Sequence, residues 1–433
     1  MTRVHQAPAD LAAKLKKLGL SSSDLSSAKH AAKAVLETGG TDQTAKLVRH
    51  LDDDALAAVR ALLGQEQGAI TLVGGTGGAV RKDLLHQKLP MTTSPDAARA
   101  LALYRPHASS VGRAFERFLI HAGRLQTELE VNADKMLDDP KVAEGVRKHL
   151  FMLQGLVRLY DGRGPDKKME KALERIKQLE DAIGAFGYAC DMRAAAAGAK
   201  GVPPGATVHL ERAVAKARNE LADLVEEWRP GKGGRSERLD DLVDTFAKID
   251  FGSAKDDAKF VRKALAGMCR DIAKKDLDMG DLEGGVHELR RQLRWIPITL
   301  IALEGLVTLD TEGKGPIPAF EKLKQDPVAQ SPFARLPTTD ADRAHIEIPW
   351  TLFLALSKAI GDLGKIKDGG QQIEGLEQAL HESGLGKAAA HAAAEHGLGK
   401  EGGARAVHDD AARLHAELKK SGLLEALAKA FTG

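Results

Sequence analysis

Apolar residues recur along most of the chain after residue 95 with the period of an α-helix. Within the segment Val142–Tyr160, four of them follow one another at steps of four, three and four residues: Val146, Leu150, Leu153 and Val157. This spacing places the four side chains on one helix face and leaves the polar residues on the other. The segment is therefore predicted to be an amphipathic helix with one buried side.

The same pattern predicts helices through most of the chain, with Ser, Thr or Asp at their starts and Gly at their ends. After residue 95 the predicted helices are Ser109–Glu130, Val142–Tyr160, Lys168–Cys190, Val208–Trp228, Leu239–Lys248, Asp256–Lys274, Gly280–Ile296 with a continuation to Leu309, Ile346–Leu363, Gln371–His381, Ala388–His396 and Ala404–Phe431. A kink or break is expected at Pro297 because proline cannot donate a helical hydrogen bond. The stretch 316–337 is expected to be irregular. The predicted fold class is all-α.

Two parts of the chain echo each other. The segment Gly155–Leu159 is repeated as Gly305–Leu309, and spaced residues of Ala182–Asp191 are repeated in Ala359–Asp368. Such self-similarity predicts a duplicated structural unit. More residues separate the two repeated segments in the second copy than in the first. We therefore place an insertion in the stretch 316–337.

These patterns predict three regions. Residues 1–90 form a small N-terminal region of short helices, with one strand-like run, Ala69–Val73. Residues 91–229 form a first helical bundle, and residues 236–433 form a related second bundle with the long insertion and a C-terminal helix. The segment Arg229–Arg235 contains a proline and three glycines, which is typical of a linker.

Composition limits the function classes. The 433 residues include 63 basic and 61 acidic residues, a net charge of +2, so a polyanion can be attracted only by a local cluster of cations. The N-terminus has no apolar signal segment, and the apolar run 296–309 is too short to cross a bilayer. The two cysteines favour buried thiols in a reducing compartment. A cytoplasmic protein without a membrane partner is expected.

No catalytic signature is present. The chain has no paired carboxylates, nucleophile elbow or cysteine–histidine arrangement, so a non-enzymatic protein without a cofactor is predicted. The glycine-rich run 74–78 follows a strand-like segment but lacks the spacing of phosphate-binding loops, and a flexible loop is the simpler interpretation. The last fifty-odd residues contain five histidines without the spacing of a metal-ligand pair. Dispersed surface histidines are favoured over a metal site there.

The sharpest candidate site is the predicted helix around residue 290. At 100° per residue, four side chains share one sector of about 100° beside the apolar face: His287, Arg290, Arg291 and Arg294. Guanidinium groups bind phosphate oxygens in a bidentate geometry, so several on one helix suit a chain of phosphates. The preceding helix adds Arg262, Lys263 and Arg270. Because acidic residues lie among these cations, an ordinary solvated surface is the alternative.

The run from His287 to Trp295 resembles the His-x-x-Arg helix of CHAD domains, the conserved-histidine α-helical domains. The resemblance implies two related helical bundles and a surface that binds inorganic polyphosphate. In the first copy, Arg147 and Lys148 correspond to part of this helix, with Arg147 aligned to Arg290. In the same alignment Glu144 replaces His287 and Phe151 replaces Arg294.

Two functions follow from the sequence. The first is the binding of polyphosphate or another polyanion by the basic helix face, which includes His287, Arg290, Arg291 and Arg294. The alternative is a helical scaffold or assembly protein that binds other protein chains or associates with itself. A metal-dependent helical enzyme is a third interpretation, which bound metal in the purified protein would support.

Overall fold

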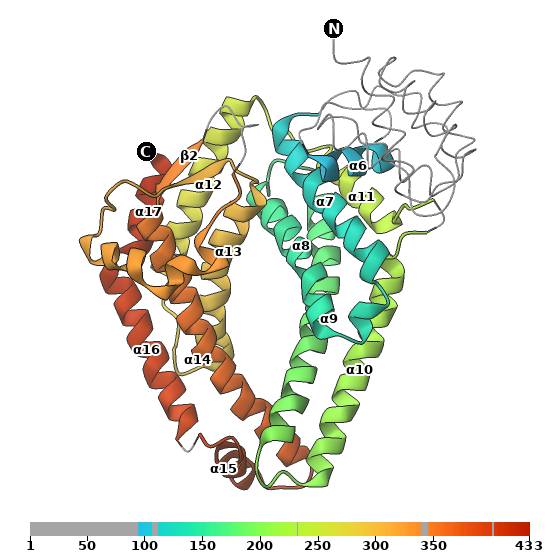
Figure 1. The fold of residues 1–433 in the computed structure, drawn as a ribbon, viewed down its shortest axis with the longest axis vertical. Coiled ribbons are helices and arrows are strands. Elements are labelled where there is room, and N and C mark those ends of the chain that lie inside the picture. The colour runs from blue at the N-terminus through green and yellow to red at the C-terminus, as the bar shows by residue number, and fades with distance from the viewer. Residues whose placement is uncertain (1–93, 106–110, 232, 339–344, 401) are drawn as a thin grey trace, which may run out of the picture. The chain divides into compact units, whose positions relative to one another are not determined.

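The computed structural model describes residues 94–105, 111–231, 233–338, 345–400 and 402–433. Within these residues the chain is almost entirely helical, which confirms the all-α prediction (Figure 1). The predicted N-terminal region 1–90, its strand-like run and its glycine-rich loop lie outside the described residues. Backbone contacts group the chain into two compact units. Unit 1 contains the residues before Asn132 together with Trp228–Ala247, and unit 2 contains Asn132–Glu227 and Lys248–Gly433.

Three helices form the described part of unit 1: α6 (Pro95–Tyr104), α7 (Arg113–Asn132), which ends at the unit boundary, and α11 (Glu237–Phe246). Ser94 and Ser236 cap the first and the last of these with their side chains. Gly123 of α7 lies against the backbone of Asp96, where an added Cβ would be 2.2 Å from the carbonyl oxygen. Only glycine allows this close approach at that position.

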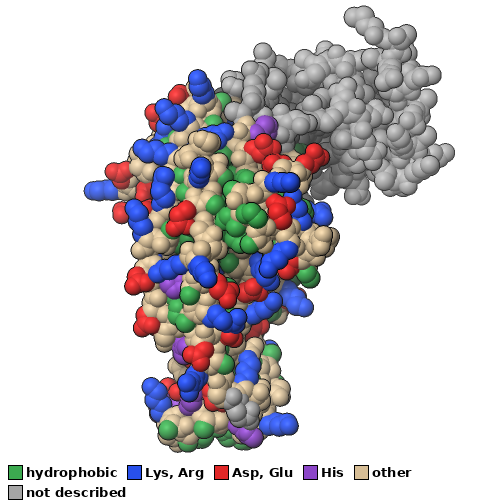
Figure 2. Space-filling view, turned by 90° about the vertical axis from the view of Figure 1, so that its left-hand side faces the viewer, with side chains coloured by type: hydrophobic (Ala, Val, Ile, Leu, Met, Phe, Trp, Pro, Cys, Tyr) green, Lys and Arg blue, Asp and Glu red, His purple; other side chains and the backbone are tan. Residues whose placement is uncertain are grey.

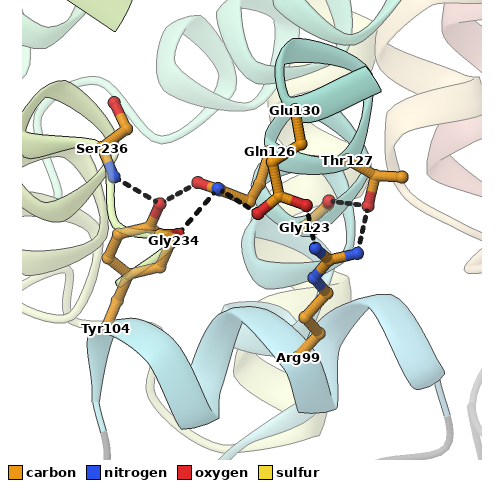
Figure 3. Close-up of polar contacts among 8 residues, drawn as sticks. All are labelled: Arg99, Tyr104, Gly123, Gln126, Thr127, Glu130, Gly234 and Ser236. Carbon is orange, nitrogen blue, oxygen red and sulfur yellow. Dashed lines mark hydrogen bonds and ion pairs between the residues drawn. The ribbon is translucent and has the colours of Figure 1, made fainter. Parts of the chain in front are cut away.

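A polar network fastens the loop before α11 to the other two helices of unit 1 (Figure 3). Gln126 donates to the carbonyl oxygen of Gly234 at 2.8 Å and to Glu130 at 2.7 Å, and it accepts a hydrogen bond from the Tyr104 hydroxyl. The backbone N–H of Ser236 donates to that hydroxyl at 3.3 Å. Burial is the main cause that raises the pKa of Tyr104, so the phenol stays neutral and can make these bonds.

Unit 2 is larger and contains the remaining elements. They are η1 (Lys135–Leu137), α8 (Pro140–Leu159), α9 (Asp166–Gly198), α10 (Pro204–Trp228), α12 (Ala254–Lys274), η2 (Leu282–His287), α13 (Glu288–Ala302), β1 (Val307–Asp310), η3 (Pro318–Gln325), η4 (Pro327–Gln330), η5 (Pro332–Ala334), β2 (Ile346–Pro349), α14 (Trp350–Glu382), α15 (Lys387–Gly397), α16 (Gly403–Ser421) and α17 (Leu423–Thr432).

Four helices of unit 2 pack as a closed ring: α8 on α9, α9 on α14, α14 on α13, and α13 on α8 (Figure 1). The two 33-residue helices, α9 and α14, extend beyond their shorter partners. At their far ends they pack with α10 and α15 around a small apolar core that includes Met192, Leu210, Ile373 and Leu380. The α8–α13 contact is close because Gly155 faces Ile298 and Thr299 of α13.

The prediction of a helix through 296–309 is wrong at its C-terminal end. Helix α13 continues through Pro297 and ends at Ala302, because Glu304 and Gly305 adopt positive φ angles of 47° and 94°. The chain then forms β1, which pairs in parallel with β2. The echoed segments 155–159 and 305–309 therefore differ in structure, since the first is helical and the second is a turn followed by a strand.

Other boundaries also differ from the predictions. The segment 346–363 begins as strand β2 and becomes helix only at Trp350. The helices predicted at 346–363 and 371–381 are one helix, α14, despite the glycines between them. The predicted helix 404–431 is divided at Gly422, whose φ of 65° ends α16. The stretch 316–337 contains three short 3₁₀ helices, and the internal duplication stays a prediction.

Candidate functional site

The predicted basic helix begins with a π-helical turn. In η2 the side chain of Asp281 accepts hydrogen bonds from the backbone N–H groups of Glu283 and Gly284. Gly285 lies against the carbonyl oxygen of Asp278, where a Cβ would be 1.7 Å away, so this turn requires glycine. The wide turn leads directly into α13 and sets which face its arginines occupy.

Three arginines of unit 2 lie close together, and we name them the arginine cluster: Arg147 of α8, and Arg290 and Arg294 of α13. The guanidinium carbons of Arg147 and Arg294 lie 5.1 and 4.9 Å from the centroid of the same ring, Phe151. Arg290 interacts electrostatically with both Arg147 and Arg294. Residues from two separate helices thus place three positive charges in one region.

The three members differ in how their charges are compensated. Arg147 donates to the buried carboxylate of Glu180 at 2.6 and 2.7 Å and lies 3.3 Å from a Glu144 oxygen. Although burial acts to lower it, these two carboxylates raise the pKa of Arg147 above its usual value. Arg147 is therefore a firmly ion-paired residue.

Arg294 and Arg290 form no ion pair of this kind with a described residue, although Asp368 acts on Arg290 and Glu180 and Glu144 act on Arg294 through their charges. Neither side chain makes a hydrogen bond or salt bridge with any other residue in the described part of the chain, and the Nε atom of Arg290 is buried without a partner. Burial is the main cause that lowers the pKa of Arg294 to about 10, and the charges of Arg290 and Arg147 lower it further. Burial also lowers the pKa of Arg290. Both arginines are held in a place that disfavours their charge.

Each of the two predicted counterparts, Arg147 and Arg290, lies over a glycine of a long helix. A Cβ on Gly184 of α9 would be 2.6 Å from an Nη atom of Arg147, and a Cβ on Gly364 of α14 would be 3.0 Å from Nε of Arg290. The absence of a side chain at these two positions makes room for the guanidinium groups.

Two aromatic rings hold the arginine cluster in place. Phe151 and Trp295 contact each other edge to face, with centroids 6.0 Å apart. The guanidinium carbon of Arg158 lies 4.6 Å from the centroid of Trp295. Burial, followed by the neighbouring charge of Arg291, lowers the pKa of Arg158. A guanidinium group over a ring loses side-chain freedom before any ligand arrives, which favours a pre-organised site.

The other predicted residues of the basic face lie around the cluster or elsewhere. Arg291 is exposed and pairs with Glu288, and Lys148 is exposed on α8. His287 lies 3.0 Å from a Glu283 oxygen, and burial nevertheless lowers its pKa. A neutral imidazole at neutral pH adds no charge to the site.

The predicted contribution from the preceding helix is different from what the sequence suggested. Arg262 donates to the backbone carbonyl oxygens of His345 at 3.0 Å and of Phe431 at 3.4 Å. It therefore ties α12 to the C-terminal end of α17. Lys263 and Arg270 are exposed on α12, and among the described residues neither shares a ring contact with the arginine cluster.

Sequence reasoning missed Glu180, Phe151 and Arg158 as parts of the site. One signal was available, because Arg147, Phe151 and Arg158 lie four and seven residues apart and share one helix face. The role of Glu180 and of the two glycines depends on which helix faces which, and no local pattern shows that.

Three of the histidines predicted to be dispersed near the C-terminus have separate partners. His381 and His408 bond to the carbonyl oxygens of Leu385 and Met279, respectively. His391 lies 2.7 Å from a Glu377 oxygen and 3.7 Å from a Glu395 oxygen. In the described ranges no group of three or more histidine, cysteine or acidic side chains is arranged to hold a metal ion.

In comparisons with known proteins, no family model, no curated protein and no solved structure matched this chain. None of the helices in the described ranges is long and apolar enough to span a membrane.

Proposed function

We propose that the chain binds a polyanion, by resemblance inorganic polyphosphate, through the arginine cluster. One observation carries the proposal: Arg290 and Arg294 are largely buried beside Arg147, yet no acidic side chain in the described ranges contacts either of them. An arrangement of this kind costs folding free energy unless an anion completes it.

Phosphate oxygens have the chemistry that the cluster lacks. They accept charge-assisted hydrogen bonds from guanidinium groups, often two at a time. A ligand with several negative charges would offset the mutual repulsion of the three arginines and the unpaired charges of Arg290 and Arg294. No bond is broken in this proposal, and it assigns a binding function only.

The experiment is a calorimetric titration of inorganic polyphosphate into the full chain and into Arg290→Met and Arg294→Met variants. Methionine keeps the length of the apolar stem and removes the charge. We expect each variant to bind at least about tenfold more weakly, which is a loss of about 1.4 kcal/mol.

The matched control is Arg270→Met, which removes an exposed arginine on α12 that is not part of the arginine cluster. It should bind as the unchanged chain does. If Arg290→Met and Arg294→Met bind as tightly as this control, or if the unchanged chain binds neither long-chain polyphosphate nor tripolyphosphate, the proposal is wrong.

A further inference from the structure

Three basic side chains of unit 2, those of the arginine cluster, converge on one place. Arg147 and Arg294 share the Phe151 ring, and Arg290 lies within the electrostatic reach of both. A row of cations suited to a long polymer would instead continue along a helix or across several of them. Convergence favours a ligand whose negative charges are also close together.

Carboxylates border the cluster. Glu144 lies beside Arg147 with 59% of its side chain exposed, and the charge of Asp368, which is 63% exposed, acts on Arg290. Glu288 pairs with Arg291 on the same helix as Arg290 and Arg294. A phosphate chain that left the cluster in these directions would meet like charges.

Three cations of α12, α13 and the loop between them are already engaged. Arg291 is paired with Glu288, and Lys275 lies 4.0 Å from the same carboxylate. Arg262 is bound to two backbone carbonyl oxygens. On the face of the molecule drawn in Figure 2, basic and acidic side chains are interspersed and no broad region carries one sign. The paired cations Arg291, Lys275 and Arg262 therefore do not extend the cluster into a row of free charges.

We infer that the ligand is a compact group of two or three linked phosphates, held at one place by Arg147, Arg290 and Arg294, and not a long chain bound along its length. The inference rests on the proposed function and narrows its ligand class. A free oligophosphate and the terminal phosphates of a longer chain share this chemistry.

The test compares inorganic tripolyphosphate with long-chain polyphosphate on the full chain, with concentrations expressed per phosphate chain. Tripolyphosphate should bind with a Kd within about threefold of that of the long chain, or the long chain should fail to bind. No more than two protein molecules should bind to one long chain, as measured by sedimentation.

A third arm uses long chains whose terminal phosphates are blocked by coupling to an amine. These should not bind, because the blocked chain offers only internal phosphates. If the long chain binds only when its ends are free, the terminal phosphates are the ligand. If only tripolyphosphate binds, the ligand is a free oligophosphate.

Opposite results would overturn the inference while leaving the proposed function intact. These are tight binding of end-blocked long chains, many protein molecules on each long chain, or a long-chain Kd more than tenfold below that of tripolyphosphate. If neither ligand binds, the proposed function fails together with the inference.

In the Arg147→Ala variant, tripolyphosphate binding should weaken about tenfold, whereas Lys148→Ala, one residue further on the exposed side of α8, should leave it unchanged.

Discussion

Arg147 and Arg294 are the same residue type in one cluster, yet their surroundings are opposite. Arg147 holds the side chain of Glu180, which is only 9% exposed, whereas Arg294 has no acidic partner among the residues that the structure describes. Removing one member of a buried ion pair leaves its partner's charge buried and unpaired, which destabilises the fold. Removing a buried charge that has no partner eliminates such an unpaired charge.

We therefore expect opposite effects of the same substitution on stability. Arg147→Met should lower the free energy of unfolding by about 2 kcal/mol, and Arg294→Met should leave it unchanged or raise it by about 1 kcal/mol. Chemical denaturation at neutral pH measures both. The explanation would be wrong if the two variants were destabilised equally. The double variant Arg147→Met, Glu180→Gln should recover part of the loss, since no buried charge then remains unpaired.

His391 predicts a dependence of stability on pH. A hydrogen bond with Glu377 is the main cause that raises the pKa of His391 above its usual value, and the charges of Glu377 and Glu395 add to it. A histidine whose pKa is higher in the folded chain stabilises the fold fully below its unfolded pKa of about 6.5. That contribution disappears as the pH rises through the folded value.

The variant His391→Gln should therefore lower Tm at pH 6 and have no effect at pH 9. Because 41% of the His391 side chain is exposed, solvent screening keeps the expected difference to about 1–2 °C. Differential scanning calorimetry at the two pH values provides the measurement. An equal loss at both values would show that the interaction does not depend on the imidazolium charge.

At the scale of elements, the ring of α8, α9, α14 and α13 brings the cluster together. The predicted counterparts Phe151 and Arg294 contact each other where α8 packs on α13. This is the arrangement expected near an internal two-fold axis, and the duplication it would express stays a prediction. In the repeat suggested by the sequence, Gly184 corresponds to Gly361. The glycine that lies under Arg290 is Gly364, one helical turn further along α14.

Alanine substitutions at these glycines test the element packing. Gly184→Ala and Gly364→Ala introduce a Cβ where a guanidinium group lies, so each should displace that flexible group and weaken tripolyphosphate binding about tenfold. Gly187→Ala and Gly361→Ala lie one turn away on the same helices with nothing within 4 Å of the new Cβ. These controls should bind normally and gain up to about 1 kcal/mol in stability. Equal binding by all four variants would contradict the placement of the arginines.

At the scale of the whole molecule, the net charge of +2 provides little long-range attraction for a polyanion. The interaction then depends on the few contacts made inside the cluster. The alternative of a helical scaffold stays open as a prediction from the sequence.

The salt dependence of tripolyphosphate binding should be correspondingly modest. With three arginines involved, a plot of log Kd against log salt concentration should have a slope of about 2 to 3, by analogy with phosphate contacts in nucleic-acid complexes. Fluorescence titration from 50 to 300 mM salt would measure it. A slope near zero would exclude charge-driven binding, and a slope well above 3 would mean that cations outside the cluster take part.

The sequence by itself determined the all-α class, most helix positions and the basic face of α13, because amphipathic periodicity and helix caps are local properties of the chain. It misassigned 303–309 and 346–349, since a parallel strand pair depends on contacts between distant segments. Only the tertiary structure decided which arginines lie together. Arg147 lies with Arg290 and Arg294 because α8 packs on α13. Arg262 is bound to backbone carbonyl oxygens and is not part of the cluster. The charged residues of a helix can be identified from its sequence, but whether each charge has an ion-pair partner depends on the neighbouring helices.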